Sequence, residues 1–163
     1  MKLGIWCPAP QTIRPDPLTK PMLDALTQHG GGPDQSFDYA VKVLNRAEEL
    51  GFDITLIAQR WFGPDLDSWI FAASLAPVVR KMQIMAAVHP GIVDPRLAAK
   101  WAATIDRISG GRFCVNIVNG TRPAEHNMYG RWIDSDGGRY QQMQEFIEVM
   151  KGLWTQDHFS YDG

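Results

Sequence analysis

The sequence predicts an α/β protein in which about four β-α units build a parallel sheet. Short apolar runs alternate with amphipathic segments of helical length, which is the pattern of repeated β-α units. The run at residues 82–88 is apolar on both faces, as expected for a strand with helices outside and packed side chains inside. With 163 residues, of which 45% are hydrophobic, the chain has ample apolar material for one core.

The first unit begins with an expected strand at residues 3–7, which ends at Pro8. Its helix is expected at residues 37–50, with Ser36 as the N-cap and Gly51 just after the end. Apolar residues in this helix repeat at i, i+3, i+4 and i+7 and define one buried face: Phe37, Ala40, Val41, Leu44 and Ala47.

The remaining units follow the same order. Strands are expected at residues 53–58, 82–88 and 112–118, and helices at residues 67–79, 94–108 and 139–154. Asp67 lies in the capping region of one helix, and Asp94-Pro95 supplies an N-cap and an N1 proline to the next, which stops at Ser109-Gly110-Gly111. Because no low-complexity break interrupts the pattern, we expect residues 1–163 to be part of a single domain.

Composition argues against several classes of partner. Lys and Arg total 16 and Asp and Glu total 18, which gives a net charge of -2 without a long run of one sign, so nucleic acid is not expected. No apolar stretch approaches the roughly 20 residues of a membrane-spanning helix. The first residues also lack a secretory signal pattern, so a cytoplasmic protein without a membrane partner is expected.

The cysteines and the motifs give no sign of a disulfide or a metal site. Cys7 and Cys114 lie in strand-like runs without CxxC or His-rich neighbours, and we expect them to be reduced structural thiols. The sequence contains no GxGxxG, no GxxxxGK[ST] and no HExxH motif, and no metal site is expected.

Four units suit either a small open sheet or half of an eight-stranded barrel, and length alone favours the open sheet. The segments after the strands favour the barrel, because the chemistry of (β/α)8 barrels lies in the loops that follow the strands. The long Pro- and Gly-rich loop at residues 8–35 suits a lid or a disordered surface segment. Gln59 and Arg60 follow the second strand beside Trp61, and the guanidinium could hold an anion or lie over the tryptophan at the surface. His89 follows the third strand, where it could be a proton donor or a structural histidine.

The fourth strand carries the strongest polar signal. Asn116 places an amide in an otherwise apolar run, which costs roughly 1–3 kcal/mol unless a bound polar ligand or a backbone group pairs with it. Glu125 follows a Pro-containing turn, and Arg139-Tyr140 opens the last helix. These three side chains could bind the polar edge of a ring system or form ordinary surface ion pairs.

The residues around the fourth strand resemble a known family. The run AATIDRISGGRF at residues 102–113, followed by VNIVNG at 115–120, is similar to a signature of the luciferase-like flavin monooxygenases. The branch it resembles comprises the alkanesulfonate, dimethylsulfone and pyrimidine monooxygenases. Supporting stretches are AEELGFD at residues 47–53 and LWTQDHFSYDG at 153–163. The resemblance implies a (β/α)8 TIM barrel of which about the first four β-α units are present.

The resemblance also implies an activity. Members of the family use reduced FMN (FMNH2), supplied by a separate flavin reductase, to insert one O2-derived oxygen atom into a small substrate, here an organosulfur or heterocyclic compound. It implies that the flavin contacts are Gln59, Arg60, Asn116, Glu125, Arg139 and Tyr140. Arg60 and His89 would be the catalytic residues that face the substrate.

Two positions depart from the family pattern. Arg60 stands where true luciferases have a histidine, which argues against luciferase-type chemistry on aldehydes. Asn119 stands where a threonine or serine is expected before the glycine, which alters the contacts to the ring.

Family members continue through about four further strands beyond the position of Gly163. We therefore expect this chain to supply half of a barrel, to bind FMN weakly or not at all by itself, and to belong to a homo-oligomer. Two alternatives stay open: a coenzyme F420-dependent oxidoreductase of the same superfamily, and a catalytically inactive binding or assembly module.

Overall fold

Four parallel strands form one sheet in the computed structural model, which describes residues 1–9, 33–61, 66–120, 122–130 and 132–163. The strands are β1 (Gly4–Trp6), β2 (Ile54–Ile57), β3 (Gln83–Val88) and β4 (Phe113–Ile117), in the spatial order β1-β2-β3-β4. Each strand therefore pairs with the next one along the chain, whereas a doubly wound open sheet reverses its strand order at a switch point. The predicted α/β class with four successive β-α units is confirmed.

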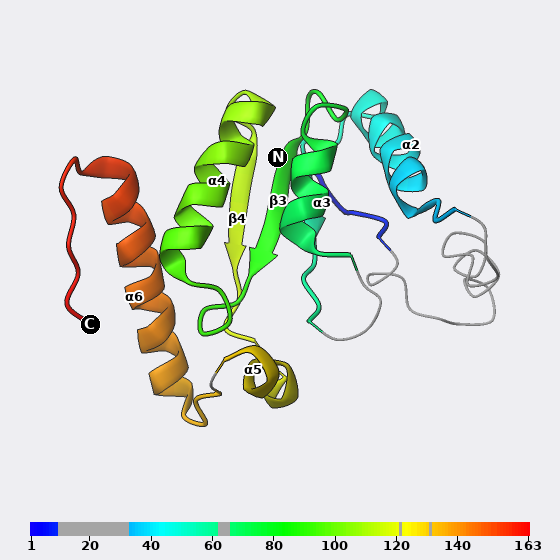
Figure 1. Cartoon of the computed structure of the whole chain (residues 1–163). Helices are drawn as coiled ribbons and strands as arrows, with labels where there is room; N and C mark the ends of the chain where they lie inside the picture. Colours follow the sequence, from blue (N-terminus) through cyan, green and yellow to red (C-terminus); the bar gives the residue numbers. More distant parts are fainter. Residues whose placement is uncertain (10–32, 62–65, 121, 131) are drawn as a thin grey trace.

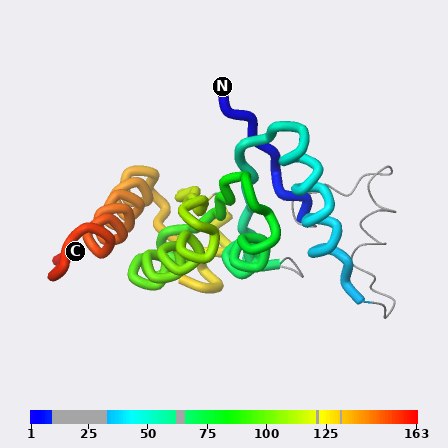
Figure 2. Tube along the Cα trace, turned by 90° about the horizontal axis from the view of Figure 1, so that it is seen from above, coloured from blue at the N-terminus to red at the C-terminus, as the bar shows by residue number. Residues whose placement is uncertain are grey.

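The helices are α2 (Ser36–Glu49), α3 (Ser68–Leu75), α4 (Pro95–Ser109), α5 (Pro123–Tyr129) and α6 (Asp136–Thr155). In Figure 1, α3 and α4 lie in front of β3 and β4, and α6 lies beside α4. Figure 2 shows α2 and α6 at opposite ends of the row of helices, with the chain's own order kept in space. Right-handed β-α units produce this one-sided layer because each helix packs back over the strand that precedes it.

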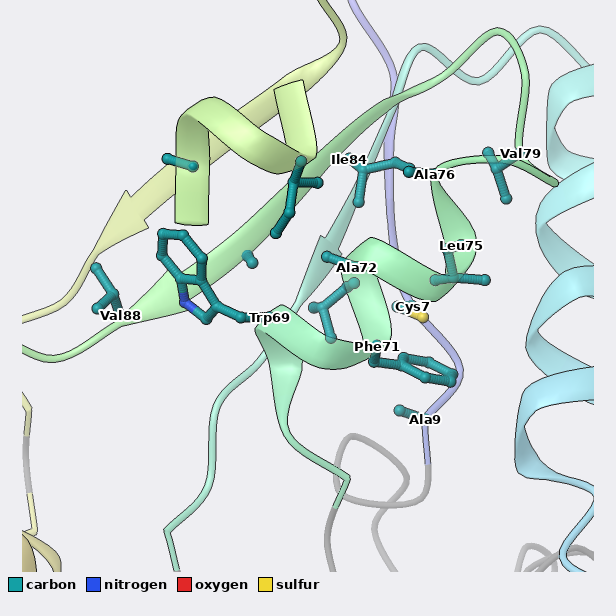
Figure 3. Close-up of a cluster of buried hydrophobic side chains, with 14 of the residues drawn as sticks. Cys7, Ala9, Trp69, Phe71, Ala72, Leu75, Ala76, Val79, Ile84 and Val88 are labelled. Atoms are coloured by element: carbon teal, nitrogen blue, oxygen red, sulfur yellow. The ribbon is translucent and has the colours of Figure 1, made fainter. Parts of the chain in front are cut away.

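The core lies between the sheet and this helix layer. In β3, Ile84, Ala86 and Val88 are fully buried, while Gln83 and Met85, which point to the opposite face, are half-buried. Figure 3 shows the α3 side chains packed over the strand residues, with the thiol of Cys7 among them. Burial raises the pKa of the Cys7 thiol to about 12, so this cysteine is the structural thiol that the sequence predicts.

The other face of the sheet carries a second row of apolar side chains. The strand register aligns Trp6 with Leu56, Leu56 with Met85 and Met85 with Cys114, so all four share one face. Trp6 is 60% exposed, and the other three are half-buried. In a closed barrel this face forms the interior, which side chains of the whole strand ring fill.

Two helix starts follow the predicted capping chemistry. The Asp67 carboxylate accepts hydrogen bonds from the backbone N–H groups of Trp69 and Ile70, and the Asp94 carboxylate accepts one from Arg96 N–H. At the end of α4, Gly110 adopts the left-handed conformation that favours glycine, with φ of 71°.

Several element ends differ from the sequence prediction. The expected helix 67–79 ends earlier, at Leu75, because Pro77 lacks the N–H that a continuing helix needs. Ser36 is the first residue of α2 and not its N-cap; the cap position is Gln35, and Asp34 accepts from the Ser36 N–H at 2.7 Å. The last helix starts at Asp136, capped by Ser135, three residues before the expected start.

Two further differences concern loops. The Pro-containing segment before Glu125, expected as a turn, opens helix α5, with Pro123 at a first-turn position. Most of the loop 8–35, for which a lid was one interpretation, lies outside the described residues.

Candidate functional site at the carboxyl ends of the strands

The predicted site residues lie mainly at one edge of the sheet. Because the strands are parallel, the residues that follow β2 and β3 and those at the end of β4 meet at the carboxyl edge. Gln59 and Arg60 follow β2, His89 follows β3, and Asn116 lies in β4 opposite Ala87. Helix α5 and the segment before α6 continue from the same edge.

Gln59 anchors the start of α3. Its side chain is buried, its carbonyl oxygen accepts from the Ser68 N–H at 2.7 Å, and its amide donates to the Asp67 carboxylate at 3.1 Å. The amide thus joins the end of β2 to the cap of the next helix. The resemblance implies that Gln59 contacts the flavin, but in the structure its side chain makes these structural hydrogen bonds.

His89 is buried against the aromatic rings of Trp61 and His126. It is 8% exposed, and its Nδ1 accepts a hydrogen bond of 2.9 Å from the indole N–H of Trp61. Its ring meets the edge of the His126 ring at a centroid distance of 5.8 Å. Burial, with further contributions from His126 and the half-buried Arg60, lowers the pKa of His89 to about 4.

Asn116 and Asn119 mark the end of β4. Asn116 is half-buried and points to the face opposite Val115 and Ile117, so its burial is less complete than the sequence suggests. The side-chain oxygen of Asn119 is buried and has no hydrogen-bond partner among the described residues. An orphaned acceptor of this kind is costly and indicates a missing partner.

Helix α5 contributes two buried polar side chains. Glu125 is 4% exposed, and its Oε1 makes no hydrogen bond to any described residue; the nearest cation is Arg122, with Nη1 at 3.7 Å. His126 is also 4% exposed, with an unpartnered Nε2 and an Nδ1 that lies 3.4 Å from the Arg122 carbonyl. His126 is the site residue that sequence reasoning missed, although its position next to Glu125 was a usable signal.

Arg139 holds the segment before α6. Its guanidinium donates to the carbonyl oxygens of Ile133 at 2.8 Å and Asp134 at 3.1 Å, pairs with Asp136, and lies 4.4 Å from the centre of the Trp132 ring. The Trp132 ring in turn contacts the His126 ring at 5.1 Å. Arg139 is therefore linked to His126 and His89 through the Trp132 ring.

The structure links some of the predicted residues through contacts and leaves others apart. His89, His126, Trp132 and Arg139 form one chain of contacts, and Arg60 influences His89 through its charge. Tyr140, by contrast, is 61% exposed on α6 and belongs to none of these contacts. Within the described residues, no group of three or more His, Cys, Asp or Glu side chains is arranged to hold a metal ion, and no helix has the length and apolarity of a membrane span.

A run of consecutive parallel β-α units with buried polar groups after the strands is typical of barrel proteins, whose sites lie at the carboxyl ends of the strands. Residues 1–163 match the luciferase-like monooxygenase family, and the chain belongs to that family. It is 39% identical over 132 residues to an FMNH2-dependent dimethylsulfone monooxygenase of Pseudomonas putida, covering 77% of this chain and 36% of the relative. It is 29% identical to the pyrimidine monooxygenase RutA of Acinetobacter baylyi, covering 100% of this chain and 44% of that protein.

Solved structures confirm the barrel fold. The monooxygenase RslO1 of Streptomyces bottropensis superposes with a TM-score of 0.77 at 24% identity, covering 100% of this chain and 46% of that one. The chain thus spans less than half the length of these relatives. The predicted (β/α)8 family, with about its first four units in this chain, is confirmed.

Proposed function

We propose that residues 1–163 are the N-terminal part of a single luciferase-like barrel domain. The whole protein is an FMNH2-dependent monooxygenase that inserts one O2-derived oxygen atom into a small organosulfur or heterocyclic substrate. The substrate class follows the relatives, which are named for dimethylsulfone and for pyrimidines. A separate flavin reductase supplies the reduced cofactor.

The observation that carries the proposal is the group of buried polar atoms after β4 that lack hydrogen-bond partners. The Asn119 oxygen and Glu125 Oε1 are buried acceptors without hydrogen-bond donors among the described residues. The isoalloxazine ring of FMN carries N–H groups that can donate to such acceptors, so this edge of the sheet fits the flavin. Asn116, at the same edge, adds an amide that can both donate and accept.

We assign Asn116, Asn119 and Glu125 to the polar edge of the flavin, which supplies the electrons for O2 activation when bound. Arg60 follows β2 at the same edge, and its charge acts on His89; its guanidinium fork would hold an oxygen of the substrate. The rings of Trp61 and Trp132 pack beside this edge and give it an apolar wall, against Tyr129 and His126 respectively. Gln59 and Arg139 act in the proposal by holding the starts of α3 and α6.

The test uses the protein expressed from its own gene, supplied with a flavin reductase, FMN and ¹⁸O₂, with dimethylsulfone and uracil as substrates. We expect one ¹⁸O atom in a product, and at least a tenfold lower kcat/KM for Asn116→Ala, since one lost polar contact to a buried group costs roughly 1.5–3 kcal/mol. Asn45→Ala, which removes an exposed amide on α2, is the matched control and should leave the rate unchanged.

Parallel reactions with reduced coenzyme F420 distinguish the alternative. Hydride transfer from F420 without oxygen uptake would replace the monooxygenase proposal with a deazaflavin oxidoreductase. Failure to bind either cofactor would instead favour an inactive binding or assembly module.

A further inference from the structure

The hydrogen bond between Trp61 and His89 determines where the His89 proton lies. An indole N–H can only donate, so His89 Nδ1, at 2.9 Å from it, must be the unprotonated acceptor. A neutral imidazole carries one proton, which is therefore on Nε2. The two ring nitrogens lie on different sides of the imidazole, so the N–H of Nε2 points away from Trp61.

Both rings of this pair are held by α5. The Tyr129 hydroxyl donates to the Trp61 carbonyl at 3.1 Å, and the Tyr129 and Trp61 rings lie 5.3 Å apart. The His126 ring packs against His89 from the same helix. The Trp61 donor is thus fixed by contacts from a second element and has little freedom to turn away.

The surroundings of His89 disfavour a second proton. Protonation would place an N–H at Nδ1 directly opposite the indole N–H. Among the described residues, the charged or titratable groups that act on His89 are Arg60, after β2, and His126, in α5, and neither is an acid that would stabilise an imidazolium. Burial acts in the same direction and lowers the pKa of His89 to about 4.

We propose that Trp61 is a positioning residue that holds His89 as a neutral imidazole protonated on Nε2. His89 then donates a hydrogen bond from Nε2 to an oxygen acceptor of the substrate, such as a sulfonyl or ring carbonyl oxygen, and does not act as an imidazolium acid. The tautomer follows from this chain's own contacts, while the acceptor rests on the proposed function.

The tautomer is tested by long-range ¹H–¹⁵N correlation NMR on the ¹⁵N-labelled chain. In the unmodified chain at pH 7, Nδ1 should resonate as an unprotonated and Nε2 as a protonated imidazole nitrogen. Trp61→Phe keeps an aromatic ring but removes the donor, so we expect a mixture of tautomers and a pKa of His89 about 1 unit higher. Trp154→Phe, which removes an indole N–H that donates to the Ala99 carbonyl, is the matched control and should change neither. A protonated Nδ1 in the unmodified chain, or an unchanged His89 in Trp61→Phe, would overturn the proposal.

The donor role is tested separately on the oxygenation reaction. His89→Gln retains an N–H near the position of Nε2 and should keep kcat/KM within about tenfold, whereas His89→Leu should lose a further tenfold or more. The pH profile of the unmodified protein should show no inflection from His89 between pH 5 and 8. If the NMR result holds but both variants retain full kcat/KM, the donor role and the placement of the reaction at this edge fail, and the tautomer assignment stands.

Discussion

Arg112, a residue of the family-like signature, has a structural role. Its guanidinium donates to four backbone carbonyls, those of Ala76, Val79, Met82 and Ser109, at 2.7–3.0 Å. These bonds tie the end of α3 and the start of β3 to the start of β4. The part of the signature that contains Arg112 therefore lies at the amino end of β4, where it stabilises the sheet, whereas its second part, residues 115–120, runs to the carboxyl end and the proposed site.

Replacing Arg112 with lysine should destabilise the fold by about 2–3 kcal/mol. A single ammonium group cannot reach four carbonyls in the geometry of the guanidinium fork, so buried acceptors lose their donors. Urea unfolding measures the change. Arg80→Lys, at an exposed position between α3 and β3, should cost less than about 0.5 kcal/mol, and equal effects of the two substitutions would contradict this role.

Gly120 is required by its conformation and by its neighbour. Its φ is +74°, and a Cβ at this position would lie 2.1 Å from Cε1 of His126. We expect Gly120→Ala to cost about 3 kcal/mol, of which roughly 1 kcal/mol is the left-handed conformation and the rest is the clash.

Gly110 provides the control for this prediction. It has a similar φ of +71° but no atom within 4 Å of a built Cβ, so Gly110→Ala should cost only about 1 kcal/mol. In a double-mutant cycle, adding His126→Ala to Gly120→Ala should restore the part of the unfolding free energy that the clash removes. If the two glycine variants unfold alike, the packing of His126 against Gly120 is wrong.

At the scale of elements, the sequence predicted those helix ends that depend only on nearby residues. The caps at Asp67 and Asp94 and the stop at Gly110 were readable because each depends on a side chain and its own helix end. Helix α5 was not, since a seven-residue segment has too few turns for a periodic pattern. Its orientation depends on contacts with Trp61 and His89 from other strands, which no local pattern contains.

The junction of β2, β3 and α5 gives the fold a pH dependence. His89 has a pKa of about 4 in the folded chain and near 6.5 when unfolded, so between these values the unfolded state binds more protons. Stability should therefore fall as pH falls from about 6.5 to 4, by at most about 1.4 kcal/mol per pH unit for this one group.

Urea unfolding between pH 4 and 7 tests this linkage. His89→Gln should remove the extra slope, because glutamine does not titrate. His158→Gln, at an exposed histidine of the C-terminal segment, should leave the slope intact. A slope that is the same in all three proteins would show that His89 is not the buried neutral group of this junction.

At the scale of the molecule, the fold class followed from the sequence because the order of β-α units fixes the topology of a parallel sheet. The candidate site was predicted less completely. Position alone identified Arg60, His89 and Asn116 at the strand ends. It could not show that Gln59 hydrogen-bonds the start of α3, that Tyr140 faces solvent or that His126 is buried. Those properties depend on side-chain packing between segments that are distant in sequence.

The homo-oligomer implied by the family stays a prediction, and the surface between α3 and α4 is where we expect the contact. An apolar groove of about 550 Å³ lies there, and its lining includes Ile70, which is 71% exposed, and Leu97, which is 50% exposed. Ile70→Glu together with Leu97→Glu should lower the mass measured by light scattering. Leu50→Glu, an equally apolar exposed position beyond α2, should not. A monomer at all concentrations would contradict the prediction.

The central claim is that reduced FMN binds at the carboxyl ends of β3 and β4. Anaerobic titration of the ¹⁵N-labelled whole protein, expressed from its own gene, with reduced FMN, followed by amide chemical shifts, tests it directly. We predict saturable shifts at residues 58–61, 116–120 and 123–126, weakened in Asn116→Ala and unchanged in Asn45→Ala. Shifts confined to the amino ends of the strands around Arg112, or no saturable shifts at all, would contradict the claim.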